Sequence, residues 1–546
     1  MSTRSFSEES NNFDSACPAL TDSRSENGQH APMPHAKVQT MTAVATSSLN
    51  HEAWSRAVVS RDPRFDGVFY VGISTTGIYC RPVCPARISD PERRRFFASA
   101  AAAEQEGFRP CLRCRPELAP GLAVCDAVPR VARAAATRIA AGGLNGRSVA
   151  DLADELGVSE RHLRRAMERE LGVSPIELAQ THRLLLAKCL LTDTSLPVTK
   201  IAFASGFQSL RRFNTVFQQR YRLSPTVLRD RPRATPIPSS DLPGDWIRLT
   251  LGFRAPLAWN ELVGSIAPDT AAGVGVVEGS RYGRTVALEG CRGVIFLENA
   301  PGSASPHVNL DFTVSLLPAL MPLLARLRHL LDLDAEPAVI DGHLAEAGLA
   351  DLVNQCPGLR FPGAFDGFDV AARELLGIDC LARVTAELGE KFETGIASLN
   401  RLALTPYRVA EAASYMTHLG VPGARADALA AVAQALAEGA LQLEPGDDLS
   451  STVEALTGIS GVGARTATAI AIRALHWPDG FPATDATLQH SLRVRGTSAL
   501  RRMAERWRPW RSYAAAHLLT TLSRNPPHGY SRLPTSSREA GRIESR

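Results

Sequence analysis

Four cysteines in two close pairs are the residues of this chain best suited to chemistry. The spacing is Cys80-x3-Cys84, then a gap of 26 residues, then Cys111-x2-Cys114. Two tight pairs separated by a short stretch of chain predict a site in which four thiolates bind one Zn²⁺. Zinc keeps a bound thiol deprotonated at neutral pH, so such a site can be structural or can act as a nucleophile. The spacing alone leaves both roles open.

A glycine hairpin followed by an aspartate is the second candidate for chemistry. The stretch LTGISGVGARTATAIAIRAL (456–475) predicts two helices joined by a tight turn at Gly461 and Gly463. Backbone N–H groups of this turn and of the next helix, which carries Thr466, could hold a phosphate. Asp485 follows in FPATDATLQHSLR (481–493). By itself, an aspartate before a helix is most often an N-cap.

Two copies of a helix, glycine turn and helix pattern lie between the cysteines and the hairpin. They span Ser148–Pro175 and Pro197–Arg229, with turns at Gly157 and Gly206, and a helix around 182–191 joins them. Polar side chains on each second helix could enter the major groove of DNA and read base edges. The candidates for these contacts are Arg161, Arg164, Arg165, Arg211, Arg212 and Asn214.

The composition is that of a large globular chain. At 546 residues it is too long for one core, and 45% hydrophobic and 21% charged residues fit a folded protein. The net charge is only +4, but residues 119–233 carry 18 Lys/Arg against 10 Asp/Glu, which suggests a nucleic-acid footprint. The polar N-terminus lacks a signal core and no apolar run is long enough for a membrane helix, so we expect a cytoplasmic protein.

The elements that must position these residues predict a multidomain α+β protein. We expect a small zinc-binding α+β domain, an all-α domain, and a region with an antiparallel sheet followed by a helical core. The expected ranges are a disordered tail (1–48), the zinc domain (49–118), the double helix-turn-helix (124–231), a proline-rich linker (232–245), the sheet (246–315), the helical core (316–524) and a second tail (525–546).

The zinc-binding stretch resembles the N-terminal domain of the adaptive-response protein Ada over about 65 residues. The segments TTGIYCRPVCPAR (75–87) and GFRPCLRC (107–114) carry the resemblance. It implies that Cys80 irreversibly accepts a methyl group from a DNA methylphosphotriester, with the other three cysteines as further zinc ligands. It also implies contacts with the DNA backbone from Thr76, Arg81, Arg87 and Arg109. A purely structural zinc site is the alternative.

The double helix-turn-helix resembles the AraC-type DNA-binding domain through the signature GFQS…F…F…RYRLSP (206–225). The resemblance implies an activator that binds two successive turns of promoter DNA as a monomer and acts on RNA polymerase. Because methylation of a thiolate removes one negative charge, uptake of a methyl group at Cys80 could strengthen promoter binding.

The C-terminal half resembles the AlkA-type DNA-3-methyladenine glycosylase II family with a helix-hairpin-helix. The segments LRFPGAFDGFDVAARELLG (359–377), FPATD (481–485) and ERWRPWRSYAAAHLL (505–519) carry the resemblance. It implies that Asp485 is the catalytic residue for removing alkylated bases from flipped nucleotides. Arg465 occupies the position of the Schiff-base lysine of lyase-type relatives. Since arginine stays protonated, we expect hydrolysis without strand cleavage.

Two departures from the glycosylase pattern leave a second hypothesis open. Arg465, Ala469 and Leu519 stand where aromatic residues that stack on the base are expected, and the segment after Gly377 is about eight residues shorter than in the family. The missing segment normally carries the loop that wedges into the duplex. The alternative is a transcriptional regulator with a zinc methyl sensor and a weak or inactive glycosylase domain. A regulator that senses a metal or a small effector is a third hypothesis.

Overall fold

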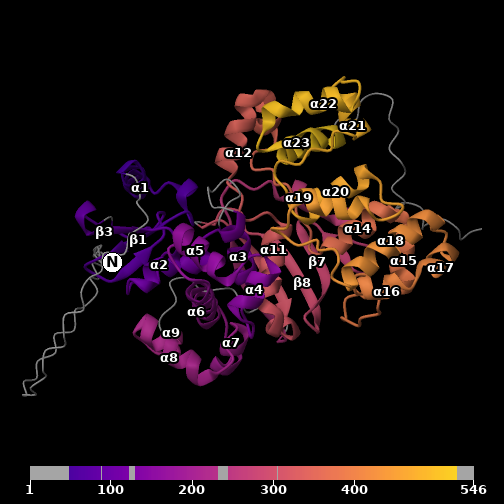
Figure 1. The fold of residues 1–546 in the computed structure, drawn as a ribbon. Coiled ribbons are helices and arrows are strands. Elements are labelled where there is room, and N and C mark those ends of the chain that lie inside the picture. Colours follow the sequence, from indigo (N-terminus) through magenta and orange to yellow (C-terminus); the bar gives the residue numbers. More distant parts are fainter. Residues whose placement is uncertain (1–47, 88, 122–129, 231–243, 304, 525–546) are drawn as a thin grey trace, which may run out of the picture. The chain divides into compact units, whose positions relative to one another are not determined.

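The computed structural model describes residues 48–87, 89–121, 130–230, 244–303 and 305–524. Most of the two expected tails and of the proline-rich linker lies outside these ranges. The described chain contains three kinds of architecture: a small mixed sheet, a group of short helices, and an antiparallel sheet followed by a long helical region (Figure 1). The predicted fold class is therefore confirmed. No helix within these ranges is long and apolar enough to cross a membrane.

The cysteine region is built on a four-stranded sheet with the order β3-β1-β2-β4. Strand β2 pairs antiparallel with β1 and parallel with β4, so that Tyr79 lies opposite Pro110. Buried aromatic side chains, among them Tyr79, Phe97 and Phe108, fill its core. The elements of this region are α1 (Ser48–Ser60), β1 (Tyr70–Ile73), β2 (Ile78–Cys80), β3 (Arg94–Phe97), α2 (Ala100–Gln105) and β4 (Arg109–Pro110).

The next region is entirely helical, and serine N-caps begin its main helices. Ser148, Ser159 and Ser209 each accept a backbone N–H from the residue three positions on, which satisfies one of the unpaired donors of a helix N-terminus. Gly157 and Gly206 have positive φ angles of 66° and 85°, which explains glycine at both turns. The helices are α3 (Arg130–Ala140), α4 (Val149–Glu155), α5 (Glu160–Leu171), α6 (Pro175–Asp193), α7 (Val198–Ala204), α8 (Leu210–Tyr221) and α9 (Pro225–Arg229).

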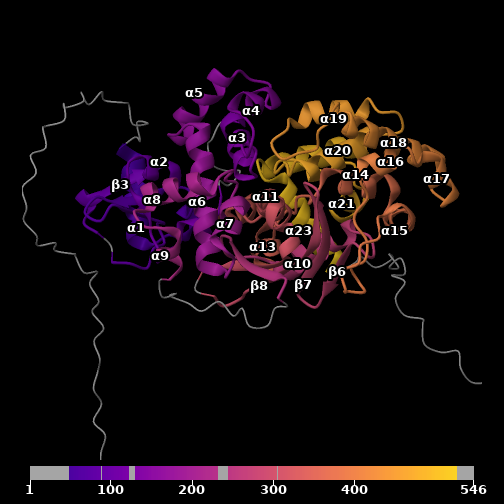
Figure 2. The same cartoon turned by 90° about the horizontal axis from the view of Figure 1, so that it is seen from below.

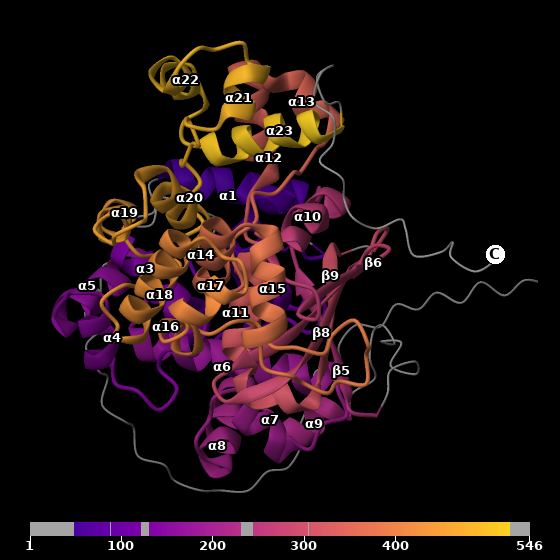
Figure 3. The same ribbon diagram turned by 90° about the vertical axis from the view of Figure 1, so that its right-hand side faces the viewer.

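A five-stranded antiparallel sheet with the order β5-β9-β8-β7-β6 follows. The strands lie side by side in Figure 3. Alternating residues such as Leu249, Ile295 and Leu310 are buried, as the period of two in the sequence predicts. The elements are β5 (Trp246–Gly252), α10 (Trp259–Ile266), β6 (Gly275–Glu278), β7 (Arg281–Leu288), β8 (Cys291–Asn299) and β9 (His307–Thr313).

The remaining helices form two packed groups. Helices α14, α16, α18, α19 and α20 pack together around a core of alanine, leucine and valine (Figure 2). Helices α13, α21 and α23 form the second group, around Trp507 and Tyr513. The helices are α11 (Leu320–Leu330), α12 (Pro337–Leu344), α13 (Ala350–Gln355), α14 (Gly367–Leu376), α15 (Ile378–Leu388), α16 (Pro406–Ala410), α17 (Ala413–His418), α18 (Gly423–Ala437), α19 (Leu449–Thr457), α20 (Ala464–Ala474), α21 (Ala486–Ser491), α22 (Thr497–Ala504) and α23 (Arg511–Arg524).

Candidate zinc centre and nucleic-acid interfaces

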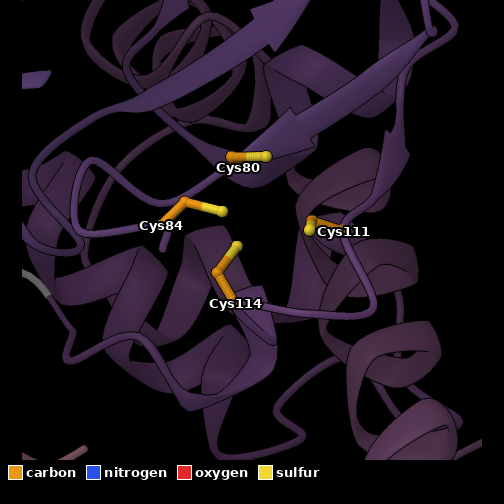
Figure 4. Close-up of side chains that lie close together, drawn as sticks. All are labelled: Cys80, Cys84, Cys111 and Cys114. Carbon is orange, nitrogen blue, oxygen red and sulfur yellow. The ribbon is translucent and has the colours of Figure 1, made fainter. Parts of the chain in front are cut away.

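The four clustered cysteines converge on one point. Their sulfur atoms all lie within 4.8 Å of one another, and the side chains point toward a common centre (Figure 4). The parallel pairing of β2 and β4 produces this arrangement, because Cys80 ends β2 and Cys111 directly follows β4. The backbone N–H of Cys111 donates to the carbonyl of Tyr79 over 2.9 Å and fixes the two strand ends.

The surroundings of the sulfurs suit thiolates bound to a metal. The backbone N–H of Arg81 donates to Sγ of Cys114, and that of Arg113 donates to Sγ of Cys111, each over 3.4 Å. None of the eight cysteines in the described part of the chain forms a disulfide bond. Four sulfurs at this separation, with N–H donors aimed at them, fit one tetrahedral Zn²⁺. The zinc site predicted from the spacing is confirmed.

The two cysteine pairs differ in their access to solvent. Cys111 and Cys114 are buried, with exposed fractions of 8% and 7%, whereas Cys80 and Cys84 are partly exposed. Solvent therefore reaches the first pair more readily than the second. This difference is compatible with Cys80 as the acceptor, but it does not distinguish Cys80 from Cys84.

One arginine expected at the DNA backbone lies elsewhere. Arg81 is buried, and its guanidinium is bound to the carboxylate of Asp66, so the expected contact of Arg81 with phosphate is wrong for this arrangement. Thr76 and Arg87 are exposed and Arg109 is partly exposed, so these three stay candidates for DNA contacts.

Each second helix of the two helix-turn-helix units presents polar side chains to solvent. Arg161 and Arg165 of α5 and Arg211, Arg212 and Asn214 of α8 are exposed. Arg164 of α5 is partly buried, and its Nε donates to Glu160 of the same helix over 2.8 Å. Such a pair one helical turn apart contributes only about 0.3–0.5 kcal/mol. A DNA phosphate could replace Glu160 as the partner of Arg164.

The junction between the zinc-binding region and α6 contains charged residues that the sequence did not single out. Glu104 of α2 is fully buried; the Tyr79 hydroxyl donates to its Oε1 over 3.1 Å and the Thr181 hydroxyl to its Oε2 over 2.9 Å. Burial raises the pKa of Glu104 to about 7. Nothing in the local sequence distinguishes Glu104 from a surface glutamate, because the groups that enclose it come from distant segments.

The hairpin between α19 and α20 contains the two glycines expected at a phosphate contact. Gly461 has a φ of 86°, and a Cβ there would lie 2.9 Å from Cβ of Ala428, so this position requires glycine. Gly463 has an ordinary φ of −73° and no neighbouring atom within 4 Å of a Cβ, so its backbone is open to a ligand. Arg465 is exposed and Thr466 partly exposed at the N-terminus of α20.

Asp485 is the N-cap of α21. Its Oδ1 accepts the backbone N–H of Leu488 over 2.9 Å, and the side chain is partly exposed. The cap uses one carboxylate oxygen and fixes the orientation of the other. The structural role of this residue is therefore compatible with a second role toward a substrate.

The departures from the glycosylase pattern have structural counterparts. Ala469 and Leu519 lie on α20 and α23, and Leu519 is 37% exposed. Gly377 is the only residue between α14 and α15. The two helices are thus joined without a loop at the place where the sequence is short.

Comparisons with known proteins identify all three parts. The metal binding domain of Ada matches residues 53–117, a helix-turn-helix domain matches 152–231, and the AlkA N-terminal domain matches 248–366. A probable bifunctional transcriptional activator/DNA repair enzyme AlkA of Mycobacterium tuberculosis is 36% identical over 480 residues, which are 86% of this chain and 95% of the relative. The chain belongs to this family of bifunctional transcriptional activator/DNA repair proteins.

Two further relatives match separate parts of the chain. DNA-3-methyladenine glycosylase 2 of Escherichia coli is 30% identical over 284 residues, which are 51% of this chain and 98% of the glycosylase. The bifunctional transcriptional activator/DNA repair enzyme Ada of the same organism is 34% identical over 140 residues, which are 26% of this chain and 38% of that protein. The resemblances to Ada and to the AlkA-type glycosylases are therefore confirmed, and the family acts in DNA repair and transcription.

Proposed function

We propose that Cys80 accepts a methyl group from a methylphosphotriester in DNA. The observation that carries a methyl-accepting centre is the convergence of four sulfurs, of which those of Cys80 and Cys84 are partly exposed while those of Cys111 and Cys114 are buried. The resemblance to the metal binding domain of Ada, which implies the acceptor at Cys80, favours Cys80 over Cys84. The thiolate of Cys80 attacks the methyl carbon. A carbon–sulfur bond forms, the carbon–oxygen bond breaks, and the electron pair stays on the phosphate oxygen. The products are a thioether and an ordinary phosphodiester anion.

The role of the protein is to hold the sulfur and the ester in line. The ester is neutral and offers little attraction to a cation, so neighbouring phosphates have to position the DNA. Arg87, which is exposed, and Arg109, which is partly exposed, can contact these phosphates, and Thr76 can donate a hydrogen bond. Zinc, when bound, keeps the thiol of Cys80 deprotonated at neutral pH.

Replacement of single cysteines tests this assignment. The Cys80→Ala chain should take up no labelled methyl group from DNA that carries methylphosphotriesters. Cys84→Ser is the matched control because Cys84 has similar exposure, and it should keep some methyl uptake if zinc is still bound. Methyl uptake by the Cys80→Ala chain, with the label on another cysteine, would show that the acceptor is wrongly assigned.

We further propose that the double helix-turn-helix binds promoter DNA as a monomer and activates RNA polymerase. The polar faces of α5 and α8 support this reading, because five of the six side chains predicted to contact DNA there are exposed. Methylation replaces a thiolate by a neutral thioether and lowers the negative charge beside the DNA. Affinity for the promoter should therefore rise after methyl uptake, and this rise should shrink at high salt.

We propose that the C-terminal part hydrolyses the N-glycosidic bond of alkylated bases without cutting the strand. The carboxylate of Asp485, held by its N-cap hydrogen bond, would stabilise positive charge on the sugar and orient the attacking water. The open hairpin backbone at Gly463 would hold a phosphate close by. A cationic base leaves without a strong general acid, which suits a site with one carboxylate.

Release of methylated bases from duplex DNA tests the glycosylase. Asp485→Asn keeps an N-cap of nearly equal quality but removes the charge, so the fold should persist while release of methylpurines falls by about 10²–10³. Loss of activity in this variant with unchanged thermal stability would support the assignment. Equal activity of parent and variant would refute the role of Asp485.

A regulator with an inactive glycosylase domain is the second candidate. The direct join of α14 and α15 at Gly377, and Ala469 and Leu519 in place of aromatic residues, favour this alternative. Without a wedge, flipping a base costs a few kcal/mol that must be recovered elsewhere. Absence of base release by a parent chain that still takes up methyl at Cys80 would favour the regulator.

We assign these functions to the ranges expected from the sequence, namely 49–118, 124–231, and 246–315 together with 316–524. The chain would act on the chromosome, within the bacterial nucleoid.

A further inference from the structure

A buried ion pair lies directly behind the zinc centre and has no part in the functions proposed above. The guanidinium of Arg81 donates through Nε to Oδ1 of Asp66 over 2.7 Å and through Nη2 to Oδ2. The two side chains are each only 8% exposed. Arg81 also donates from Nη1 to the carbonyl of Cys114 over 3.2 Å, and from its backbone N–H to Sγ of Cys114 over 3.4 Å. Asp66 therefore holds Arg81, and Arg81 holds one zinc ligand at two points.

Asp66 is held in turn by an arginine from the sheet of the glycosylase-like part. Arg254, two residues after β5, donates to the carbonyl of Asp66 from Nη2 over 2.7 Å and from Nε over 3.1 Å. Arg254 is 3% exposed, and Oε2 of Glu336 lies 3.0 Å from its Nε. Its other contacts are the carbonyls of Asp334 and Gly121, at 2.7 Å and 3.0 Å. All three nitrogens of the Arg254 guanidinium thus have hydrogen-bond partners, and these contacts fix its orientation.

The backbones of the two parts also approach each other too closely for side chains. A Cβ at Gly252, the last residue of β5, would lie 2.1 Å from the carbonyl oxygen of Leu118 at the end of the zinc-binding region. A Cβ at Gly67, beside Asp66, would lie 2.1 Å from the carbonyl oxygen of Pro120, which directly follows the same region. Contacts this short require glycine, because neither backbone oxygen can move independently of its chain. The first approach fixes β5 against the zinc-binding region close to Arg254, and the second fixes the backbone beside Asp66.

We propose that Asp66 and Arg254 are positioning residues of the methyl-accepting centre, so that the glycosylase-like part completes the zinc site. The chain of contacts runs from Arg254 to the Asp66 backbone, from the Asp66 carboxylate to Arg81, and from Arg81 to Cys114. Groups that hold a metal ligand set its orientation and its electron density, and their loss typically weakens metal binding by about 10–100-fold. The effect on methyl transfer rests on the proposed function, whereas the effect on zinc retention does not.

Arg254→Gln in the full chain is the decisive variant, and Arg248→Gln is its control. Arg248 lies on β5 and pairs with Asp311 of the same sheet, at 2.6 Å, so its loss perturbs the sheet without touching Asp66. The measurements are the rate of zinc transfer to a chromogenic chelator, the visible spectrum of the Co²⁺-loaded chain, and methyl uptake. The Co²⁺ bands report ligand geometry directly, which a general loss of stability would not move.

We expect Arg254→Gln to release zinc about tenfold faster than the parent, to shift the Co²⁺ bands and to slow methyl uptake. Arg248→Gln should match the parent in all three. Parental zinc release and spectrum in a folded Arg254→Gln chain would overturn the proposal.

If the Arg254→Gln chain does not fold, the Asp66→Asn variant tests the same positioning role. This variant keeps the backbone carbonyl for Arg254 but weakens the hold on Arg81, so it should also release zinc faster and shift the Co²⁺ bands. Parental behaviour of Asp66→Asn would overturn the proposal. Altered zinc retention together with a complete lack of methyl uptake in the parent would refute the proposed methyl transfer but keep the positioning role.

Discussion

Replacing Glu104 with Gln should remove a pH dependence from the stability of the folded chain. Glu104 is fully buried between the zinc-binding sheet and α6, with hydrogen bonds from Tyr79 and Thr181 and with Nε of Arg220 at 4.0 Å. The cost of burying a charge outweighs these favourable contacts, so the pKa of Glu104 rises from 4.5 to about 7. Its carboxyl group therefore titrates near neutral pH.

The pKa of Glu104 is raised on folding, and this direction decides how the stability of the folded chain changes with pH. A carboxyl group whose pKa is raised on folding stabilises the folded state fully below the unfolded pKa, and this contribution is lost as the pH rises through the folded pKa. With the values 4.5 and about 7, the folded state loses on the order of 1 kcal/mol between about pH 6 and about pH 8.5 through this group alone. Glutamine keeps the shape and cannot titrate, so the variant should not show this loss.

Urea denaturation of parent and variant at the two pH values, with zinc present, measures the effect. The free energy of unfolding of Glu104→Gln relative to the parent should rise by on the order of 1 kcal/mol from the lower to the higher pH. Glu106→Gln is the control, because Glu106 lies close by in the sequence and is exposed. A difference between parent and Glu104→Gln that does not change with pH would refute the reasoning.

The remaining predictions concern DNA contacts. Gly461→Ala should destabilise the helical core by about 1–2 kcal/mol, because its φ of 86° disfavours a side chain and the new Cβ would meet Ala428, as thermal unfolding can show. Gly463→Ala should leave stability nearly unchanged and weaken binding to duplex DNA, because its Cβ would occupy only the open space at the hairpin; unchanged DNA affinity would exclude this turn from the interface. Arg165→Gln should lower the slope of log affinity against log salt by about 0.9 if the exposed Arg165 neutralises one phosphate, and titrations of promoter DNA at several salt concentrations measure this slope.

Much of the local structure follows from short-range patterns. The sequence predicted a turn at Gly157 and at Gly206, and both glycines have positive φ angles in the structure. Ser159 and Ser174 cap the helices that follow them, and these contacts likewise involve only residues three positions apart. The spacing of the cysteines predicted one zinc site, since only nearby residues can supply each pair of ligands. The hairpin glycines were likewise recognisable, although only Gly461 needs the conformational freedom of glycine.

The sequence by itself thus determined the order of the parts, the zinc ligands and the polar faces of the helices that could meet DNA. Only the tertiary structure decided that Arg81 faces Asp66 rather than a phosphate, that Glu104 is enclosed, and that Arg254 reaches the backbone behind the zinc centre. The physical reason is the range of the interactions. Caps, turns and ligand pairs depend on neighbours within a few residues. The burial of a charge depends on groups from distant parts of the sequence, and Asp66 and Arg254, for example, are 188 positions apart.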